Sequence, residues 1–288
     1  MFQVASHPAA FGLHPHGQYP SSSNYQSPAV KLPRNLARPP FVDISRDAIL
    51  AVAPELENVP TEYIRRGLRP KANVMLAGIA ALAPSHLPSA LPRSHIPQSL
   101  TIPVRSTSEH PEFPTHIIAL SSSTSSSNDQ LRLFPVHSLV LASHCARLPR
   151  IPPSTVTGPS STQLTLPILP MSLPSPAAFT ILHQFMYYHR LDSVLKALFP
   201  LPQNFLHSLS HHTVQATLRS EGTLRQLSSY LCASASSNLQ TLTSHAAHVK
   251  ELWQDMAALG LYDPELWDTI DLAWEIVLGA LNLAASGN

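Results

Sequence analysis

The last third of the chain carries two apolar patterns with the spacing of helices. Residues 249–259 place apolar side chains at intervals of three or four, and Gly260 follows them as a C-cap glycine does. A second helical pattern begins at Asp263 and Pro264, an N-cap residue followed by the residue favoured at N1. Because the link between them is short, we expect the two helices to pack as an antiparallel pair.

The middle of the chain carries strand patterns. Residues 115–120 and 131–136 are rich in β-favouring side chains, and the polar stretch 121–130 separates them as a hairpin loop does. Residues 164–169 alternate apolar and polar positions, and 99–104 can form a short edge strand. These runs predict a small sheet.

Helical spacing is also found beside these strands. Apolar residues over 139–148 follow the second strand directly. Ser175 and Pro176, in N-cap and N1 order, open the clearest helix of the middle region. Its wide apolar face is formed by Ala178, Ile181, Leu182, Phe185 and Tyr188.

These elements predict an α+β protein with four regions. The regions are a disordered tail over 1–40, an N-terminal helical segment over 41–83, a sheet-and-helix core over 99–195 with a Pro- and Ser-rich insert at 149–162, and a C-terminal helical region over 196–285. In the second region, Ser45 and Thr61 can each cap a short helix, the first of them running to Val52, and 73–82 is typical of a third. The tail has few large aliphatic side chains, so burial cannot offset the entropy of ordering it.

Composition adds limits to this picture. Of 288 residues, 44% are hydrophobic, which is enough to bury a core, while 29 prolines against 9 glycines indicate long extended linkers. The net charge of +1 gives no general attraction to nucleic acid or to a membrane. One basic cluster is formed by Arg65, Arg66, Arg69 and Lys71. It can contact phosphates or an import receptor, or it can be a solvated helix end.

Cysteine use and hydropathy bear on the compartment. Cys145 and Cys232 do not provide a disulfide framework, and residues 1–17 lack the charged and apolar parts of a signal peptide, which indicates a reducing compartment. The longest uninterrupted apolar stretch, 74–83, is about half of what a bilayer span needs, and Glu275 interrupts the apolar C-terminal helix. No membrane segment is expected.

Two segments of the middle region carry a resemblance. The first reads Phe134-Pro135-Val136-His137-Ser138-Leu139-Val140-Leu141-Ala142-Ser143-His144-Cys145, and the second runs from Phe179 to Leu191. Both resemble the signature of BTB/POZ domains, in which a strand ends in an aromatic residue and a His opens a helix. The resemblance implies a BTB/POZ-like core, in which the matching positions are structural: Phe134, His137, Val140, Leu141, Cys145, Phe179, Leu182, Phe185 and Tyr187.

A wider resemblance covers residues 41–285. The segments that carry it are Ile44-Ser45-Arg46-Asp47-Ala48-Ile49, Val59-Pro60-Thr61-Glu62-Tyr63-Ile64-Arg65-Arg66, Pro114-Thr115-His116 and the stretch 136–149. They are similar to the clampless family of basidiomycete fungi. This resemblance implies a nuclear regulator of sexual development, needed for clamp-cell formation and dikaryotic growth, that binds transcription factors of the mating pathway. It supplies no catalytic residues.

Sixteen histidines invite a catalytic or metal-binding interpretation. Cys145 diverges from His137 and His144 on their common predicted helix, so three zinc ligands do not assemble locally. A nucleophilic Cys145 would need a base within reach, and a small buried apolar side chain is the simpler interpretation. The sequence also lacks a G-x-S-x-G elbow, a Walker loop and a dinucleotide loop. We therefore expect no catalytic residue, no metal and no cofactor.

The C-terminal region carries polar and aromatic groups for which structural roles are available. Its acids Asp263, Glu265, Asp268 and Asp271 mark a helix N-terminus, where they favour the macrodipole. His211, His212, His245 and His248 are expected to be solvated. The three tryptophans, Trp253, Trp267 and Trp274, can be core residues or interface anchors.

The leading hypothesis is a non-enzymatic regulator that binds other proteins through a few apolar anchors. A second hypothesis makes the same core an adaptor for a cullin ubiquitin ligase, with the helical region as its substrate reader. A third is direct DNA binding through residues 61–73, and a fourth is a hydrolase that uses Cys145 with a distant His.

Overall fold

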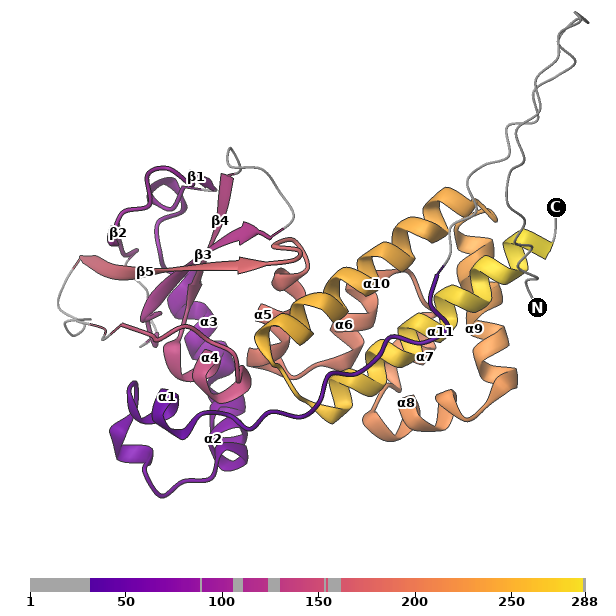
Figure 1. The fold of residues 1–288 in the computed structure, drawn as a ribbon, viewed down its shortest axis with the longest axis horizontal. Coiled ribbons are helices and arrows are strands. Elements are labelled where there is room, and N and C mark those ends of the chain that lie inside the picture. The colour runs from indigo at the N-terminus through magenta and orange to yellow at the C-terminus, as the bar shows by residue number, and fades with distance from the viewer. Residues whose placement is uncertain are drawn as a thin grey trace, which may run out of the picture. The chain divides into compact units, whose positions relative to one another are not determined.

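The computed structural model describes residues 32–286, apart from 89, 106–110, 124–129, 153 and 155–161. Residues 1–31 of the predicted tail therefore lie outside the described residues, as do most of the hairpin loop and much of the insert. From Asn35 onward the chain forms one compact unit, which mixes a sheet with helices as the α+β class requires (Figure 1).

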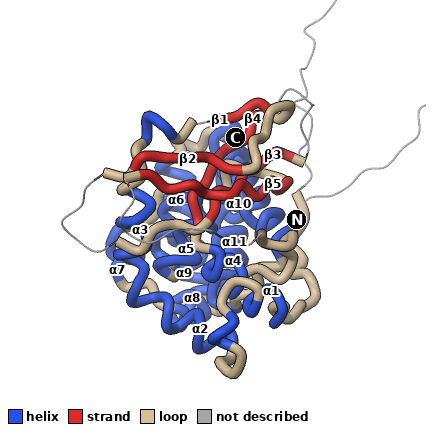
Figure 2. The backbone as a smooth tube through the Cα atoms, turned by 90° about the vertical axis from the view of Figure 1, so that its left-hand side faces the viewer, coloured by secondary structure: helices blue, strands red, loops and turns tan. Residues whose placement is uncertain are grey.

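The sheet has five strands in the order β1-β4-β3-β5-β2. The strands are β1 Ala90–Pro92, β2 Ser99–Pro103, β3 His116–Ser122, β4 Gln130–Val136 and β5 Gln163–Leu173. Strand β3 is antiparallel to β4 and parallel to β5, and β2 lies at the edge beside β5, as predicted for residues 99–104. Figure 2 shows the strands together on one side of the helices.

The central strand is buried on both faces. Ile117 and Ala119 pack in a cluster with Leu82 and Ile102 and with residues of β4 and β5. Side chains alternate along a strand, so Ile118 and Leu120 point to the opposite face, where they are equally buried. The run 115–120 is predicted as a strand from its β-favouring residues, and burial on both faces suits its uninterrupted apolar part, 117–120.

Short helices precede the sheet. They are α1 Arg46–Leu50, η1 Pro54–Leu56, α2 Thr61–Leu68, η2 Arg69–Lys71, α3 Ala72–Ala80 and η3 Pro84–His86. Ser45 caps α1 as predicted, and its Oγ accepts the Ala48 N–H at 3.3 Å. The predicted cap at Thr61 is wrong, because Pro60 is the N-cap and Thr61 is the first helical residue. Val52 lies beyond α1, which stops after five residues.

Two helices follow strands β4 and β5. Helix α4 spans Ser138–His144 and is shorter than the predicted 139–148, because Cys145 is extended and forms a β-bridge with Leu261. Helix α5 spans Phe179–Tyr188 and begins later than the predicted Ser175. Residues 176–178 form a turn there, in which the Ser175 carbonyl accepts the Ala178 N–H at 3.0 Å.

The C-terminal region is helical, as predicted. It consists of α6 Leu191–Leu198, α7 Gln203–His207, α8 His211–Leu218, α9 Glu221–Ser234, α10 Leu239–Leu259 and α11 Pro264–Ser286. Gly260 ends α10 in the left-handed region with φ 63°, and Asp263 Oδ1 accepts the Leu266 N–H at 3.0 Å to cap α11. These two helices lie side by side (Figure 1), with Trp267 and Trp274 of α11 buried in the core.

Helix α11 is long and apolar enough to cross a membrane by length and composition alone. Half of its most apolar stretch is buried within the protein, against α6, α8, α9 and α10. A core helix of a protein that does not enter a membrane passes the same test, so this feature carries no further conclusion.

The predicted disordered tail, 1–40, includes residues that the structure shows packed on helices. Residues 35–42 lie in contact with α10 and α11 (Figure 1), and Leu36 is only 6% exposed. Arg38 reaches α11, where it bonds Asp268 and Asp271. Sequence reasoning missed this packing because each partner is more than 200 residues away along the chain.

Candidate functional site

The segments that carry the BTB/POZ resemblance meet at one junction. The Tyr187 hydroxyl of α5 lies 2.8 Å from His137 Nδ1 and accepts the His137 backbone N–H at 3.1 Å. His137 Nε2 is 3.1 Å from the Glu112 carbonyl, so both ring nitrogens are engaged. Burial lowers the pKa of His137 and raises that of Tyr187, which keeps both side chains neutral.

Aromatic contacts extend this junction from strand β4 to α5. The rings of Phe134 and Phe179 meet edge to face at 5.0 Å, and His183 Nε2 lies 3.1 Å from the Pro135 carbonyl. Burial lowers the pKa of His183 to about 4. The prediction that the stretch from Phe134 and the helix around Phe185 fold against a common sheet is therefore confirmed. The remaining signature residues, Val140, Leu141, Leu182 and Phe185, are buried beside it.

The structure does not prepare Cys145 for nucleophilic chemistry. Its thiol is buried 3.8 Å from the Met186 sulfur, and burial raises its pKa to about 12. The neighbouring His144 has its Nδ1 2.9 Å from the Val140 carbonyl, and burial lowers its pKa to about 4. Among the described residues, no group of three His, Cys, Asp or Glu side chains could hold a metal ion.

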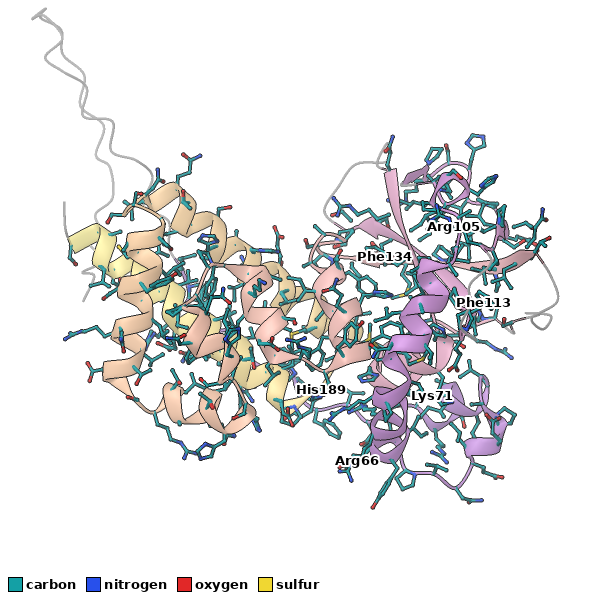
Figure 3. The ribbon with its side chains drawn as sticks, turned by 180° about the vertical axis from the view of Figure 1, so that it is seen from behind. Arg66, Lys71, Arg105, Phe113, Phe134 and His189 are labelled. Atoms are coloured by element: carbon teal, nitrogen blue, oxygen red, sulfur yellow. The ribbon has the colours of Figure 1, made fainter. Side chains whose placement is uncertain are left out.

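The basic cluster is split by the fold. Arg65 turns inward and donates from Nε to the Ser143 carbonyl of α4 at 2.5 Å, and burial lowers its pKa. Arg66 stays exposed, 3.4 Å from Glu62, and Lys71 lies 4.0 Å from Glu112 (Figure 3). Arg69 is exposed on the same helical run. Arg66, Arg69 and Lys71 therefore face solvent, whereas Arg65 joins two helices.

A pocket of about 400 Å³ lies between α3, α5 and α6. It is lined by Asn73, Ile181, Gln184, Phe185, Tyr188, Arg190, Ser193 and Val194. Tyr188 stands at its rim with 44% of the side chain exposed, and Arg190 beside it forms an ion pair with Asp192 at 2.5 Å. Sequence reasoning assigned Tyr188 to an apolar core face, whereas the helix carries it to the surface.

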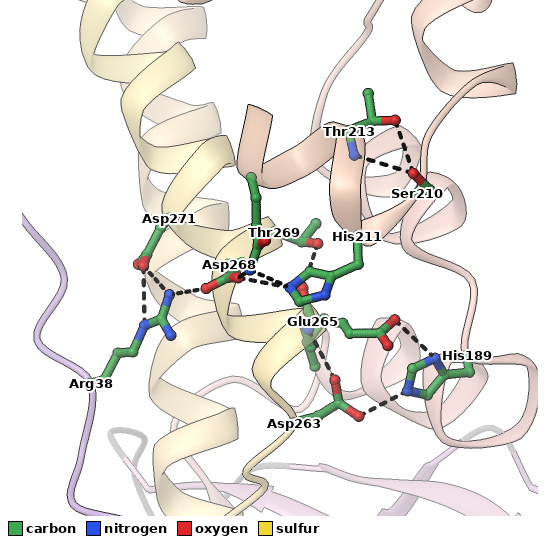
Figure 4. A network of polar contacts seen from close by, with 12 residues as sticks. Arg38, His189, Ser210, His211, Thr213, Asp263, Glu265, Asp268, Thr269 and Asp271 are labelled. Atoms are coloured by element: carbon green, nitrogen blue, oxygen red, sulfur yellow. Dashed lines mark hydrogen bonds and ion pairs between the residues drawn. The ribbon is translucent and has the colours of Figure 1, made fainter. Parts of the chain in front are cut away.

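Carboxylates on the first turns of α11 form a polar network with three distant segments (Figure 4). Asp263 lies 2.8 Å from His189 at the end of α5, and Asp268 lies 2.8 Å from His211 of α8. Asp268 also accepts a bond from Arg38. The prediction that His211 is solvated is wrong, because α8 packs its ring against α11.

Within this network the pKa of one carboxyl group is lowered and the pKa of another is raised. Burial alone would raise the pKa of Asp268, but hydrogen bonds from Arg38, Gln215 and His211 hold it below its usual value. Asp271 has Arg38 as its partner, and burial keeps its pKa above the usual value. These acids therefore act as acceptors for distant partners, in addition to the predicted role at a helix N-terminus.

Comparison with family models gives two matches along the chain. The model of the clampless protein 1 N-terminal domain matches residues 39–174, and that of the C-terminal domain matches 192–288. The chain belongs to the clampless family. Membership of the clampless family suggests a developmental regulator. Searches of curated proteins and of solved structures found no match.

Helix α5 falls between the two matched regions of this clampless-family protein. It contacts α4 on the N-terminal side and both α6 and α10 on the C-terminal side. Tyr187 bonds His137 of the first region, and His189, just after the helix, bonds Asp263 of the second. The helix therefore joins the two regions through specific polar contacts.

Proposed function

We propose that this clampless-family protein regulates fungal sexual development, including clamp-cell formation and dikaryotic growth, by binding transcription factors of the mating pathway in the nucleus. The observation that carries the proposal is the family match over 39–174 and 192–288. The protein acts by contact and does not transform a substrate.

The geometry supports contact as the mode of action. Cys145 and His144 are buried, and the half-buried His183 is bonded to the Pro135 carbonyl, so these side chains are engaged inside the fold. Concave, partly apolar pockets are the usual places for a ligand or partner side chain. The pocket between α3, α5 and α6 can receive an apolar side chain of a partner, with Tyr188 as its exposed anchor.

Complementation tests the developmental role. A strain that lacks its own clampless protein receives the gene for this chain, and its matings are scored for clamp cells. Restored clamp cells are expected. Unrestored matings, despite expression of a folded chain, would contradict the role in development.

Recovery of partners tests the mode of action. Nuclear extract is passed over the folded chain, and homeodomain or zinc-finger regulators are expected among the bound proteins. Tyr188→Ala is expected to reduce their recovery, whereas Tyr230→Ala leaves it unchanged. Tyr230 is a matched control because it is 43% exposed and lies on α9, away from the pocket. Equal recovery of partners by both variants would show that the pocket beside Tyr188 does not bind them.

The same preparation separates the rival hypotheses. Recovery of a cullin in place of transcription factors would favour the adaptor role implied by the BTB/POZ resemblance. Direct DNA binding would use Arg66, Arg69 and Lys71, so affinity would fall steeply with salt. The same three charges are our candidates for recognition by an import receptor.

A further inference from the structure

Residues 35–42, here called the strap, cross the surface of α10 and α11 as an extended segment. The strap forms neither helix nor strand. Leu36 is buried, and the indole Nε1 of Trp253 on α10 donates to the Ala37 carbonyl at 3.0 Å. The first part of the strap is therefore held by the buried side chain of Leu36 and by the main-chain carbonyl of Ala37.

Arg38 provides the charged contact of the strap (Figure 4). Its Nη2 donates to Asp268 at 2.6 Å and also to Asp271, and its Nε donates to Asp271 at 3.1 Å. The two carboxylates stand three residues apart on α11, where like charges repel. A guanidinium fork satisfies both at once, and such charge-assisted bonds are about twice as strong as neutral ones.

The rest of the strap is largely exposed. Phe41 packs edge to face on Tyr262 at 4.8 Å but is still 59% exposed. Pro39, Pro40 and Val42 border a cavity of about 10 Å³, roughly the volume of one water molecule, above Gly260 and Leu261. This end of the strap is therefore more exposed than the end at Leu36.

The surface under the strap has the chemistry of a groove that recognises proline-rich peptides. Such grooves combine aromatic side chains with acidic groups, and they bind extended segments that lose little entropy. Here Trp253 and Tyr262 supply the aromatic rings, while Asp268 and Asp271 supply the acids. The strap itself, Asn-Leu-Ala-Arg-Pro-Pro-Phe-Val, is a ligand of that kind.

We propose that this surface is a docking groove for an extended, arginine-bearing, proline-rich segment of a partner protein, and that the strap occupies it as a built-in competitor. A tethered segment has an effective concentration of about millimolar, so it excludes weaker or scarcer ligands until they displace it. The inference rests on the proposed function for the existence of a partner, but the groove can be tested without one.

The test uses the full chain and a labelled peptide of residues 35–42, with binding measured by fluorescence anisotropy. The unchanged chain should bind the peptide weakly because its own strap fills the groove. Arg38→Ala should bind it about tenfold more tightly, since the competing strap has lost its charge-assisted bonds. Arg93→Ala, at an exposed position near β1, is the control and should match the unchanged chain. Equal affinity for all three chains would overturn the proposal.

Further arms identify the contacts. In the Arg38→Ala background, Asp271→Asn should lower peptide affinity about tenfold, and a peptide with Ala in place of its Arg should lose affinity to a similar extent. Asp271 is preferred to Asp268 for this test because Asp268 also bonds His211 and Gln215. A peptide affinity that neither substitution changes would overturn the proposed groove.

Hydrogen exchange on the unchanged chain gives a measurement that requires no variant. The indole N–H of Trp253, which donates to the Ala37 carbonyl, is expected to exchange at least a hundredfold faster than the backbone amides in the middle of α11, because the strap opens without global unfolding. Exchange of this indole N–H at the rate of α11 would show that the strap is a fixed part of the core and would overturn the proposal. Concentration-dependent dimers would assign the groove to a second copy and would also overturn it. Neither result would affect restoration of clamp cells.

Discussion

The Tyr187 hydroxyl and the His137 backbone N–H are 3.1 Å apart, although 50 residues separate them in sequence. The same hydroxyl lies 2.8 Å from His137 Nδ1, so one phenol satisfies two polar groups at the start of α4. Both residues are at most 4% exposed, and water cannot easily replace either contact. The pairing therefore fixes α5 against the end of strand β4.

Replacing Tyr187 by Phe should lower the free energy of unfolding by about 1–3 kcal/mol, because it leaves a buried donor and a ring nitrogen without their partner. Tyr188→Phe is the matched control, since the neighbouring hydroxyl belongs to a side chain that is 44% exposed. Urea denaturation of both variants measures the difference. Equal stability of the two would mean that water replaces the lost contact.

Local patterns identified the elements of this junction, whereas they did not identify its pairings. Residues 131–136 were predicted as a strand and the region of Phe185 as an apolar helix face, and both are confirmed because propensity and periodicity are local. The signature of His137 and Tyr187 marked both positions as structural. The hydrogen bond between them depends on tertiary packing, which periodicity does not report.

The contacts of Arg38 and His211 show the same limit. Each pairs with an acid of α11 that is more than 50 residues away, and neither belongs to a motif. Arg65 was grouped with its basic neighbours, although it follows the buried Ile64 and lies on the side of α2 that packs against α4. In each case charge was visible in the sequence, while burial was decided by segments far along the chain.

Two glycines in neighbouring helices provide a matched pair for testing helix packing. A Cβ at Gly78 of α3 would lie 1.9 Å from the Glu112 carbonyl oxygen, a backbone atom just before Phe113 (Figure 3). Gly78→Ala should therefore destabilise the protein by about 2 kcal/mol or more through overpacking. Gly67 of α2 has nothing within 4 Å of that position.

Gly67→Ala should stabilise the protein by about 0.5–1 kcal/mol, because alanine is the better helix former. Gly78→Ala and Gly67→Ala are thus expected to shift the midpoint of thermal unfolding in opposite directions. Destabilisation by both substitutions would indicate that helix α2 needs its glycine for a reason other than space.

The His189 and Asp263 pair predicts a loss of stability in acid. Burial by itself raises the pKa of Asp263, but the hydrogen bond and charge of His189, together with the Leu266 N–H, hold it below the usual value. A carboxyl group with a lowered pKa in the folded state contributes stability above its unfolded pKa of about 3.9, and this contribution is lost as pH falls through the folded value.

Asp263→Asn should keep the cap of α11, since asparagine is a good N-cap, and should replace the carboxylate that faces His189 with a neutral amide. We expect a loss of about 1–2 kcal/mol at pH 6 that shrinks by pH 3.5, measured by urea denaturation. Asp43→Asn, at an exposed position, is the control. A loss that stays constant between these pH values would assign the effect to packing.

Asp255 of α10 predicts the opposite dependence on pH. It is fully buried, its Oδ1 accepts the Ser175 N–H at 2.8 Å, and its Oδ2 has no hydrogen-bond partner among the described residues. Burial raises its pKa to about 7, and the charge of Glu251 adds to this while the Ser175 N–H opposes it. The folded state therefore holds a proton that the unfolded chain releases near pH 4.

A carboxyl group with a raised pKa contributes stability below its unfolded value, and this contribution is lost as pH rises to the folded value. Between pH 5 and pH 8 the unchanged protein should therefore lose about 2–3 kcal/mol relative to Asp255→Asn, whose amide does not titrate and can still accept the Ser175 N–H. Urea denaturation of both proteins at the two pH values measures this, and the comparison cancels groups that titrate equally in both. A difference that does not change with pH would show that Asp255 is ionised in the folded protein and that its second oxygen is hydrated.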